Sequence, residues 1–225
     1  MNMIQAAAAC MAKKKNALPP STLNDGLLHY YAEGTDLKGS TDLVATGVPS
    51  SETAKIGGGT CMGLDGTTNY SIADLDAGDF EGNQDVTFSF WFNPNLFATY
   101  PRVFGKDVGT NYRCYLDLSG YLTSNWGGRN VTHAVANVVG TWSLGVVSWT
   151  QVGGTLSVMV NDNTPTTSAG GTGTSNGHPF YIGNDSGSNP GFNGEIDQFC
   201  VWHRALTSGE LTELYNGGSG TNFLA

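Results

Sequence analysis

Charged side chains are scarce in this chain of 225 residues, where Asp, Glu, Lys and Arg together make up only 13%. Helical proteins use far more Glu, Lys, Ala and Leu, so the composition speaks against a mainly helical fold. Glycine, by contrast, occupies 32 positions. This balance favours short strands joined by tight turns, and the length is enough for one large all-β domain.

Basic residues are scarcer than acidic ones, 10 against 19, for a net charge of −9. Residues 1–24 contain Lys13, Lys14 and Lys15 and no acid. Residues 25–225 therefore hold 7 basic and 19 acidic groups, a net charge of −12. Such a body would repel a phosphate backbone, so we expect no nucleic-acid partner.

Long apolar runs are missing as well. No stretch reaches the roughly 20 apolar residues of a membrane-spanning helix, so we expect no membrane span. The run Ile4–Ala12 is short and precedes the lysines, whereas an export signal carries its positive charge in front. We therefore expect no secretion signal in this sequence.

The four cysteines, Cys10, Cys61, Cys114 and Cys200, form no C-x-x-C pair and show no metal-ligand spacing. A bridge between Cys61 and Cys200 remains open, because the first and last strands of a sandwich often lie side by side. The alternative is buried free thiols, as expected in a chain kept in the cytoplasm. Phosphate-binding loops are also missing, because the glycine-rich tracts lack the lysine and the following helix of such a loop.

Short strand patterns with turn residues between them fill most of the chain. The clearest is Val86–Phe92, where Val86, Phe88, Phe90 and Phe92 alternate with other side chains, as in a half-buried strand. The glycine-rich tract Thr166–Gly177 is predicted to be a loop. The other predicted strands are Leu27–Tyr31, Cys61–Leu64, Tyr70–Ala73, Arg102–Gly105, Tyr112–Leu118, Tyr121–Asn125, Val131–Ala136, Leu144–Thr150, Thr155–Val160, Phe180–Gly183 and Gly194–Trp202.

A helix is predicted only after the last strand. Thr207 and Glu210 form a T-x-x-E capping box, and Gly217 and Gly218 provide the stop. The sequence thus predicts an all-β fold, an antiparallel two-sheet jelly-roll sandwich with a short C-terminal helix. Residues 1–24 are predicted to be an N-terminal arm, and residues 25–225 one domain.

Several motifs occur in an order that resembles the laminin-G-like, concanavalin A-like lectin and glucanase family. The resemblance covers about residues 26–217 and implies a scaffold known for binding sugars and protein partners, often with a structural calcium. It does not by itself identify a ligand. The motifs are Glu33-Gly34, Asp36-Leu37-Lys38-Gly39, Leu64-Asp65-Gly66, Thr87 with Ser89 and Trp91, Asn93-Pro94, Trp142–Trp149, Val160-Asn161, Ile182-Gly183 and the closing segment Gly194–Glu210.

Glycosidases of the laminarinase type share this fold and carry E-x-D-x-x-E on one strand, so that both catalytic carboxylates line one cleft. Glu195 and Asp197 match the first half of that motif, but Gln198, Phe199, Cys200 and Val201 follow, so the second catalytic carboxylate is missing. We therefore expect no enzymatic activity. A glycoside hydrolase is the third interpretation.

The resemblance offers another role for Asp197, as a carboxylate that holds loops or binds calcium. Glu33 and Asp36 follow the first strand and are candidates for the same site, because family members often bring these ends together. Calcium requires several oxygen ligands at one point. A structural calcium held by Asp197, Glu33 and Asp36 is thus the candidate cofactor.

For a ligand, the segment Tyr121–Asn130 combines an aromatic plane with polar groups. Trp126 offers a stacking face, and Asn125, Arg129 and Asn130 offer the hydrogen bonds that a sugar needs. The alternative for Trp126 is a structural position at the edge of the sandwich.

The functional interpretation is a non-catalytic structural or adhesion module. A single module without an export signal resembles virion surface proteins of tailed phages, such as capsid decoration or tail-associated proteins, made in the host cytoplasm. On this hypothesis residues 1–24 attach the protein to the virion, where it is oligomeric or bound in the assembly, and the loop edge presents a glycan site. The second interpretation is an extracellular carbohydrate-binding module.

Overall fold

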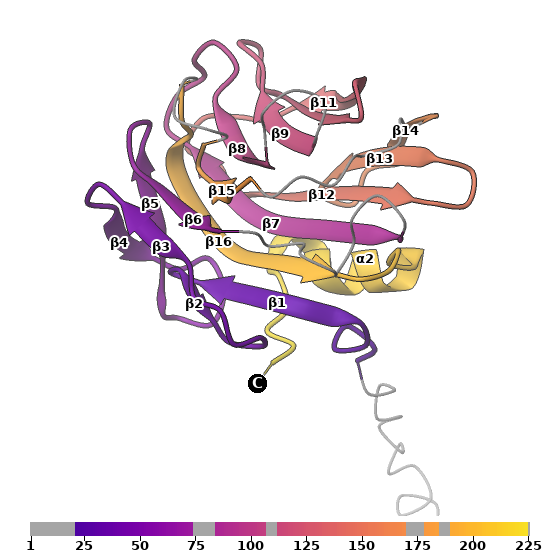
Figure 1. The fold of residues 1–225 in the computed structure, drawn as a ribbon, viewed down its shortest axis with the longest axis horizontal. Coiled ribbons are helices and arrows are strands. Elements are labelled where there is room, and N and C mark those ends of the chain that lie inside the picture. Colours follow the sequence, from indigo (N-terminus) through magenta and orange to yellow (C-terminus); the bar gives the residue numbers. More distant parts are fainter. Residues whose placement is uncertain (1–20, 74–83, 107–111, 170–177, 185–189, 225) are drawn as a thin grey trace, which may run out of the picture.

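The predicted strands assemble into two antiparallel sheets that pack face to face (Figure 1). The computed structural model describes residues 21–73, 84–106, 112–169, 178–184 and 190–224. Their sandwich confirms the predicted fold class. One short helix, α2 (Ser208–Tyr215), follows the last strand and leads into the 3₁₀ turn η1 (Asn216–Gly218).

The larger sheet has a main path of seven strands, and two more strands join it beside its longest member, β16. Its strands, in spatial order, are β14 (Thr166–Ala169), β13 (Thr155–Val160), β12 (Ser143–Thr150), β7 (Val86–Pro94), β16 (Asn193–Trp202), β1 (Leu27–Ala32) and β2 (Thr35–Asp36). The two additional strands are β5 (Thr60–Asp65), paired with β16, and β4 (Ser50–Thr53), paired with β5.

The smaller sheet faces the inner side of the larger one. In spatial order its strands are β11 (Arg129–Ala136), β10 (Tyr121–Trp126), β9 (Tyr112–Leu116), β8 (Arg102–Lys106), β15 (Phe180–Ile182), β6 (Asn69–Ile72) and β3 (Val44–Thr46).

Four short strands, β2, β3, β4 and β14, have no counterpart in the sequence prediction. The tract Thr166–Gly177 was predicted to be a loop, but its first four residues form β14 and pair with β13. The polar side chains of β14 carry no apolar alternation, because this strand lies at an exposed sheet edge. Residues 170–177 lie outside the described residues.

Strand β7 is buried on both faces, so the prediction of a half-buried strand is wrong. Its alternation is real: Phe88, Phe90 and Phe92 pack between the sheets. The opposite face is covered too, because Trp91 stacks on Tyr215 of α2 with ring centroids 6.1 Å apart. The helix and the C-terminal segment thus provide a second apolar layer on the outer face of the larger sheet.

Cysteines make no bridge in the described part of the chain. Cys61, Cys114 and Cys200 are buried free thiols. Of the two alternatives, the Cys61–Cys200 bridge is therefore wrong and the free thiols are confirmed. Burial raises the pKa of Cys61 to about 12. Cys10 lies outside the described residues.

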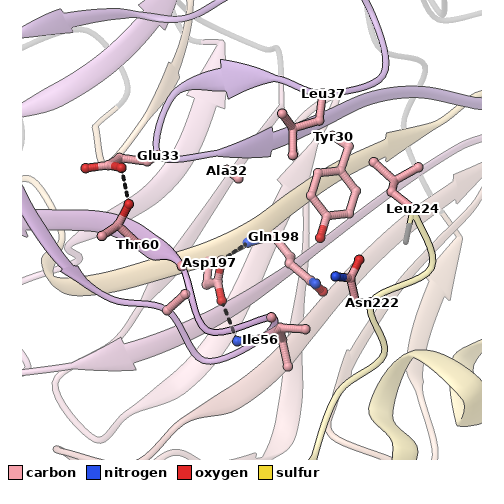
Figure 2. A pocket seen from close by; sticks show the side chains of 13 residues that line it. Tyr30, Ala32, Glu33, Leu37, Ile56, Thr60, Asp197, Gln198, Asn222 and Leu224 are labelled. Carbon is pink, nitrogen blue, oxygen red and sulfur yellow. Dashed lines mark hydrogen bonds between the residues drawn. The ribbon is translucent and has the colours of Figure 1, made fainter.

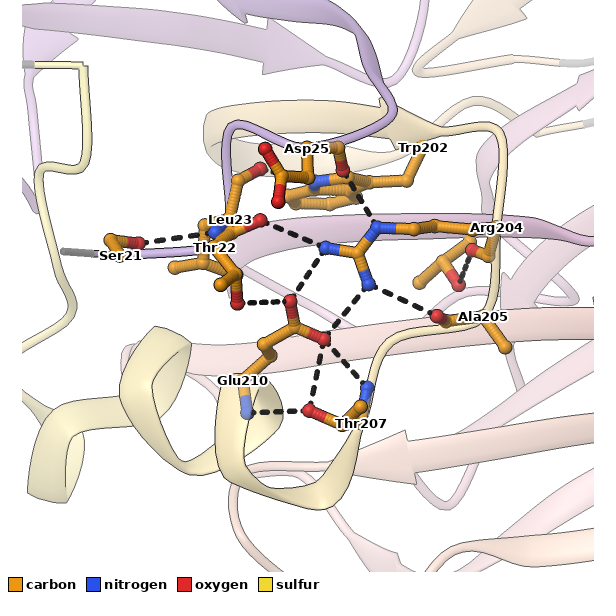
Figure 3. Close-up of polar contacts among 10 residues, drawn as sticks. Ser21, Thr22, Leu23, Asp25, Trp202, Arg204, Ala205, Thr207 and Glu210 are labelled. Carbon is orange, nitrogen blue, oxygen red and sulfur yellow. Dashed lines mark hydrogen bonds and ion pairs between the residues drawn. The ribbon is translucent and has the colours of Figure 1, made fainter. Parts of the chain in front are cut away.

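The first described residues, 21–24, pack on the domain although the predicted boundary places them in the arm. Leu23 is fully buried, and its carbonyl accepts a 2.7 Å hydrogen bond from the Trp202 indole. Thr22 donates to the carboxylate of Glu210 at 2.6 Å (Figure 3). Residues 1–20 of the predicted arm lie outside the described residues. No helix within the described ranges is long and apolar enough to cross a membrane.

Candidate functional site

Two hollows lie along the outer face of the larger sheet, where β16 runs beside β5 and β7. On β16, Ile196 points into the core between the sheets. Strand alternation therefore places Glu195 and Asp197 together on the outer face. Each of these two carboxylates lines a different hollow.

The first hollow, the Asp197 pocket, has a volume of about 260 Å³. Figure 2 shows its polar groups, with the amides of Gln198 and Asn222 beside the Tyr30 hydroxyl. Its complete lining is Tyr30, Ala32, Glu33, Leu37, Ala54, Ile56, Gly57, Gly59, Thr60, Asp197, Gln198, Asn222 and Leu224.

A β-bulge shapes the Asp197 pocket. The register of β16 against β7 shifts between Asp197 and Cys200, and Gln198 adopts a positive φ of 46° within the bulge. Left-handed backbone is costly for a residue other than glycine and marks places where a strand redirects its side chains. Here the bulge brings both Asp197 and Gln198 to the lining of the pocket.

Asp197 uses both carboxylate oxygens to hold backbone. Oδ2 accepts a 2.9 Å hydrogen bond from the amide of Ile56, and Oδ1 accepts one of 2.8 Å from the amide of Gln198. Burial raises the pKa of Asp197, against the opposing effect of these backbone donors. The carboxylate thus anchors the loop between β4 and β5, which is the loop-holding role that the sequence offered.

Glu33 reaches the same pocket from the tight turn between β1 and β2. Glu33 and Gly34 both have positive φ, 50° and 86°, as the favoured two-residue turn of a β-hairpin requires. The side chain of Glu33 accepts a hydrogen bond from the Thr60 hydroxyl. Hydrogen bonds from Ser51 and Thr60 lower the pKa of Glu33.

Asp36 does not line the Asp197 pocket. Its Oδ1 accepts amide hydrogen bonds from Tyr30, Lys38 and Gly39, and its Oδ2 lies 2.7 Å from Nδ1 of His29. Burial acts to raise the pKa of Asp36, but these hydrogen bonds outweigh it and lower the pKa.

The three predicted calcium ligands are not assembled into a ligand set. Among the described residues no three His, Cys, Asp or Glu side chains converge as metal ligands. The oxygens of Asp36 and Asp197 are already hydrogen-bond acceptors for the chain itself. In this arrangement the three residues do not fit a calcium site.

The predicted glycan site lies on the hairpin between β10 and β11. Trp126 is 1% exposed, and its ring is stacked between Tyr112 and Trp149 at centroid distances of 4.7 and 5.7 Å. Its stacking faces are therefore occupied by the protein's own aromatic rings. The position of Trp126 therefore matches the alternative interpretation, in which this tryptophan has a structural role.

The polar members of the hairpin site are divided between interior and surface. Asn125 is buried, and its amide donates a 2.8 Å hydrogen bond to Asn130 across the hairpin. Arg129 and Asn130 are exposed. Glycan binding at this hairpin stays a prediction that now depends on these two exposed side chains.

The second hollow, the Glu195 trough, has a volume of about 220 Å³ and is lined by Glu52, Thr53, Asn93, Trp142 and Glu195. The five residues come from β4, β7, β16 and the turn before β12. Register explains their meeting, because Ser50 pairs with Gly63, Gly63 with Glu195, and Glu195 with Asn93. The trough therefore runs across neighbouring strands.

Trp142 is exceptional among the five tryptophans of the chain. The other four, Trp91, Trp126, Trp149 and Trp202, are at most 2% exposed. Trp142 is only partly buried, and it is one of the residues that line the trough. Trp142 packs against the outer apolar cluster, and the rest of its indole lies beside two carboxylates and an amide.

Glu195 is held partly out of water. Its Oε2 is buried without a hydrogen-bond partner, as is Oδ1 of Asn93. Burial raises the pKa of Glu195, and the charge of Glu52 adds to this effect, while hydrogen bonds from Asn93 and Asn95 oppose it. Buried polar atoms without partners are rare in folded proteins, and they mark this trough as incompletely satisfied.

Sequence reasoning missed Glu52, Asn93 and Trp142 as a group. Their positions lie on separate strands, and only the pairing of β4, β5, β16 and β7 brings them together. A usable signal was the position of Trp142 directly before β12, outside the strand itself.

Comparisons with known proteins agree with the fold. The sequence profile described as "Concanavalin A-like lectin/glucanases superfamily" matches residues 65–212. A search of curated proteins found no match in sequence.

Among solved structures, domain 4 of AbnA, a GH43 extracellular arabinanase from Geobacillus stearothermophilus in complex with arabinotriose, is 20% identical with a TM-score of 0.65. The match covers 83% of this chain and 96% of that one. The binding domain of Paraclostridial Mosquitocidal Protein 1 is 16% identical with a TM-score of 0.70, over 87% of this chain and 53% of that one.

The binding domain of Botulinum Neurotoxin DC in complex with SialylT is 12% identical with a TM-score of 0.64, over 86% of this chain and 52% of that one. This chain thus spans about half the length of the two toxin chains. At these identities the likeness shows the fold alone.

Proposed function

Since the chain belongs to the concanavalin A-like lectin and glucanase superfamily, we propose that its domain is a non-catalytic module that binds a glycan in the Glu195 trough. The observation that carries this proposal is Trp142, which is the only one of five tryptophans that the core leaves partly exposed and which lines the trough. The proposal moves the glycan site away from the predicted hairpin.

The trough has the mixed chemistry that sugar rings require. The CH face of a sugar ring packs against a flat indole, and its hydroxyl groups donate hydrogen bonds to carboxylate and amide oxygens. Trp142 offers the first kind of contact, while Glu195, Glu52 and Asn93 offer the second.

Related solved structures support a binding role without fixing its ligand. Two of them are binding domains, and one is a domain in complex with arabinotriose. Arabinotriose is therefore a reasonable first probe for this chain.

The non-catalytic part of the proposal rests on Asp197. Glycoside hydrolysis needs two carboxyl groups that are free to act on the same bond. Both oxygens of Asp197 accept backbone hydrogen bonds, so the pair Glu195 and Asp197 lacks its second free member. Glu52 is the other carboxylate at the trough, and turnover by a Glu195–Glu52 pair is the outcome that would overturn this part.

Attachment to a virion stays a prediction. Residues 21–24 of the predicted arm pack on the domain, and residues 1–20 lie outside the described residues. The test is whether removing residues 1–20 abolishes incorporation into particles while the domain still folds.

The direct test is binding of the full chain to a glycan microarray that includes arabinotriose. We expect signal on at least one glycan, and Trp142→Ala should lower the affinity for it by about tenfold or more, because a stacking face is lost. Tyr100→Ala is the matched control, since Tyr100 is a 51% exposed aromatic residue that does not line the trough.

Two outcomes would count against this function. Signal that is absent on every glycan, or that Trp142→Ala leaves unchanged, would remove the trough as a glycan site. Release of shorter sugars from a bound glycan, abolished in Glu195→Gln, would show that the module is an enzyme instead.

A further inference from the structure

All the charged groups that line the Glu195 trough are carboxylates. Glu52 and Glu195 contribute these charges, and the other lining residues, Thr53, Asn93 and Trp142, are neutral. The nearest lysine in sequence, Lys55, places its Nζ 5.3 Å from the centroid of the Trp91 ring and is not part of the lining.

Gly63 allows the two carboxylates to share the trough. Strand β5 separates Glu52 on β4 from Glu195 on β16, and Gly63 is the residue of β5 that pairs with Glu195. A Cβ atom built on Gly63 would lie closest to Oγ of Ser50 and 2.7 Å from Cγ of Glu52. The side chains of Ser50 and Glu52 therefore lie over Gly63, in the space that any other residue would fill.

The orientation of Glu52 is fixed locally. The hydroxyl of Ser50 donates a 2.7 Å hydrogen bond to Oε1 of Glu52 on the same exposed strand. The charge of Glu52 acts on Glu195, where it disfavours the ionised form. The two carboxylates are therefore close enough to interact across the glycine.

We infer that the trough takes uncharged or amino sugars and excludes sugars that carry carboxylate or sulfate groups. This inference rests on the proposed glycan-binding function and adds the ligand class. Its basis is the pairing of Glu52 and Glu195 over Gly63, without a basic side chain in the lining.

Electrostatics gives the direction of the preference. An anionic sugar in the trough would meet two like charges in a place where burial already disfavours the charge of Glu195. A hydroxyl group donates to the same carboxylates without this repulsion, and an ammonium group donates a charge-assisted hydrogen bond, which is stronger. The negative net charge of residues 25–225 acts in the same direction.

The experiment compares five probes on the full chain by biolayer interferometry at low ionic strength: arabinotriose, cellotriose, a glucosamine trimer, sialyllactose and a galacturonic acid trimer. We expect binding among the first three and at least about tenfold weaker binding of the two anionic sugars. Glu52→Gln, which changes an exposed residue, should reduce this difference in affinity between the two groups of sugars. The double variant Glu52→Gln/Glu195→Gln should reduce it further.

Glu213→Gln on α2 is the charge-matched control, because it removes one negative charge from a residue outside the trough. The inference would be overturned if an anionic sugar bound most tightly. It would also be overturned if the affinity difference between uncharged and anionic sugars were the same in Glu52→Gln as in Glu213→Gln. Either result would leave glycan binding itself in place. Loss of binding for all five probes, with no other array signal, would remove the proposed function itself.

Discussion

Arg204 and Glu210 face each other in a two-pronged ion pair, with Nη2 2.6 Å from Oε1 and Nη1 2.8 Å from Oε2 (Figure 3). Arg204 also donates to the carbonyls of Asp25 and Thr22. The pair therefore joins three segments: the first described residues, the end of β16 and the start of α2. This contact places the beginning of the domain against its end.

Removing the arginine should destabilise the domain. Arg204→Met keeps the aliphatic part of the side chain but leaves Glu210 and the carbonyl groups of Thr22, Asp25 and Ala205 without this donor. We expect a loss of about 2–4 kcal/mol in the free energy of unfolding, slightly below the cost for a fully buried pair, because the side chain of Arg204 is 26% exposed. Urea unfolding measures this loss of stability, and Arg129→Met, which changes an exposed arginine, is the control. Equal stability of the two variants would contradict the role of the pair.

Acid should weaken the same contact. Hydrogen bonds from Arg204, Thr22 and Thr207 lower the pKa of Glu210 from 4.5 to about 2. A carboxyl group with a lowered pKa stabilises the fold above its ordinary pKa, and this stabilisation is lost as pH falls through the lowered one. The stability difference between wild type and Glu210→Gln should be constant from pH 7 to about 5 and shrink toward pH 2. A difference that does not change with pH would be inconsistent with this assignment.

The sequence predicted this corner of the molecule only in part. The capping box of Thr207 and Glu210 could be read locally, and both of its reciprocal hydrogen bonds are present in α2. Arg204 and residues 21–24 could not be placed on it, because Thr22 is 182 positions from Arg204 and 188 from Glu210 in the chain. A helix cap can be predicted from neighbouring residues, but its contacts with distant segments depend on the tertiary packing.

Tryptophans show the same limit for the candidate site. A tryptophan within a polar hairpin, Trp126, has the sequence signature of a sugar platform, yet it is sandwiched between Tyr112 and Trp149 in the core. Trp142 has no such signature. It lies directly before β12 and is partly exposed beside Glu195 and Asn93, which the pairing of β16 with β7 brings together. Residue patterns within one strand do not encode that pairing.

Stability should therefore separate the two tryptophans. Trp126→Ala removes a stacked, fully buried ring and should cost about 3–5 kcal/mol, whereas Trp142→Ala should cost less than about 2 kcal/mol. Urea unfolding of both variants measures the difference. Similar losses for the two would mean that Trp142 is a core residue and not a ligand platform.

Glu195 should respond to pH in the opposite sense to Glu210. Its pKa is raised by burial, so the folded state favours the protonated carboxyl, and the stability that this proton provides is lost as pH rises through the raised pKa. Glu195→Gln keeps the shape without the charge, so its stability relative to wild type should increase as pH rises above 4.5, the ordinary pKa of a glutamate. Parallel stability curves over that range would refute the desolvation of Glu195.

The most direct test of the central claim is an NMR titration that follows the five indole N–H signals while the glycan with the strongest array signal is added. We expect the Trp142 signal to shift with saturation and the buried Trp126 signal to stay close to its starting position. A saturable shift at Trp126 or at the backbone amides of Arg129 and Asn130, with Trp142 unchanged, would place the ligand on the β10–β11 hairpin and rule out the Glu195 trough as the glycan site.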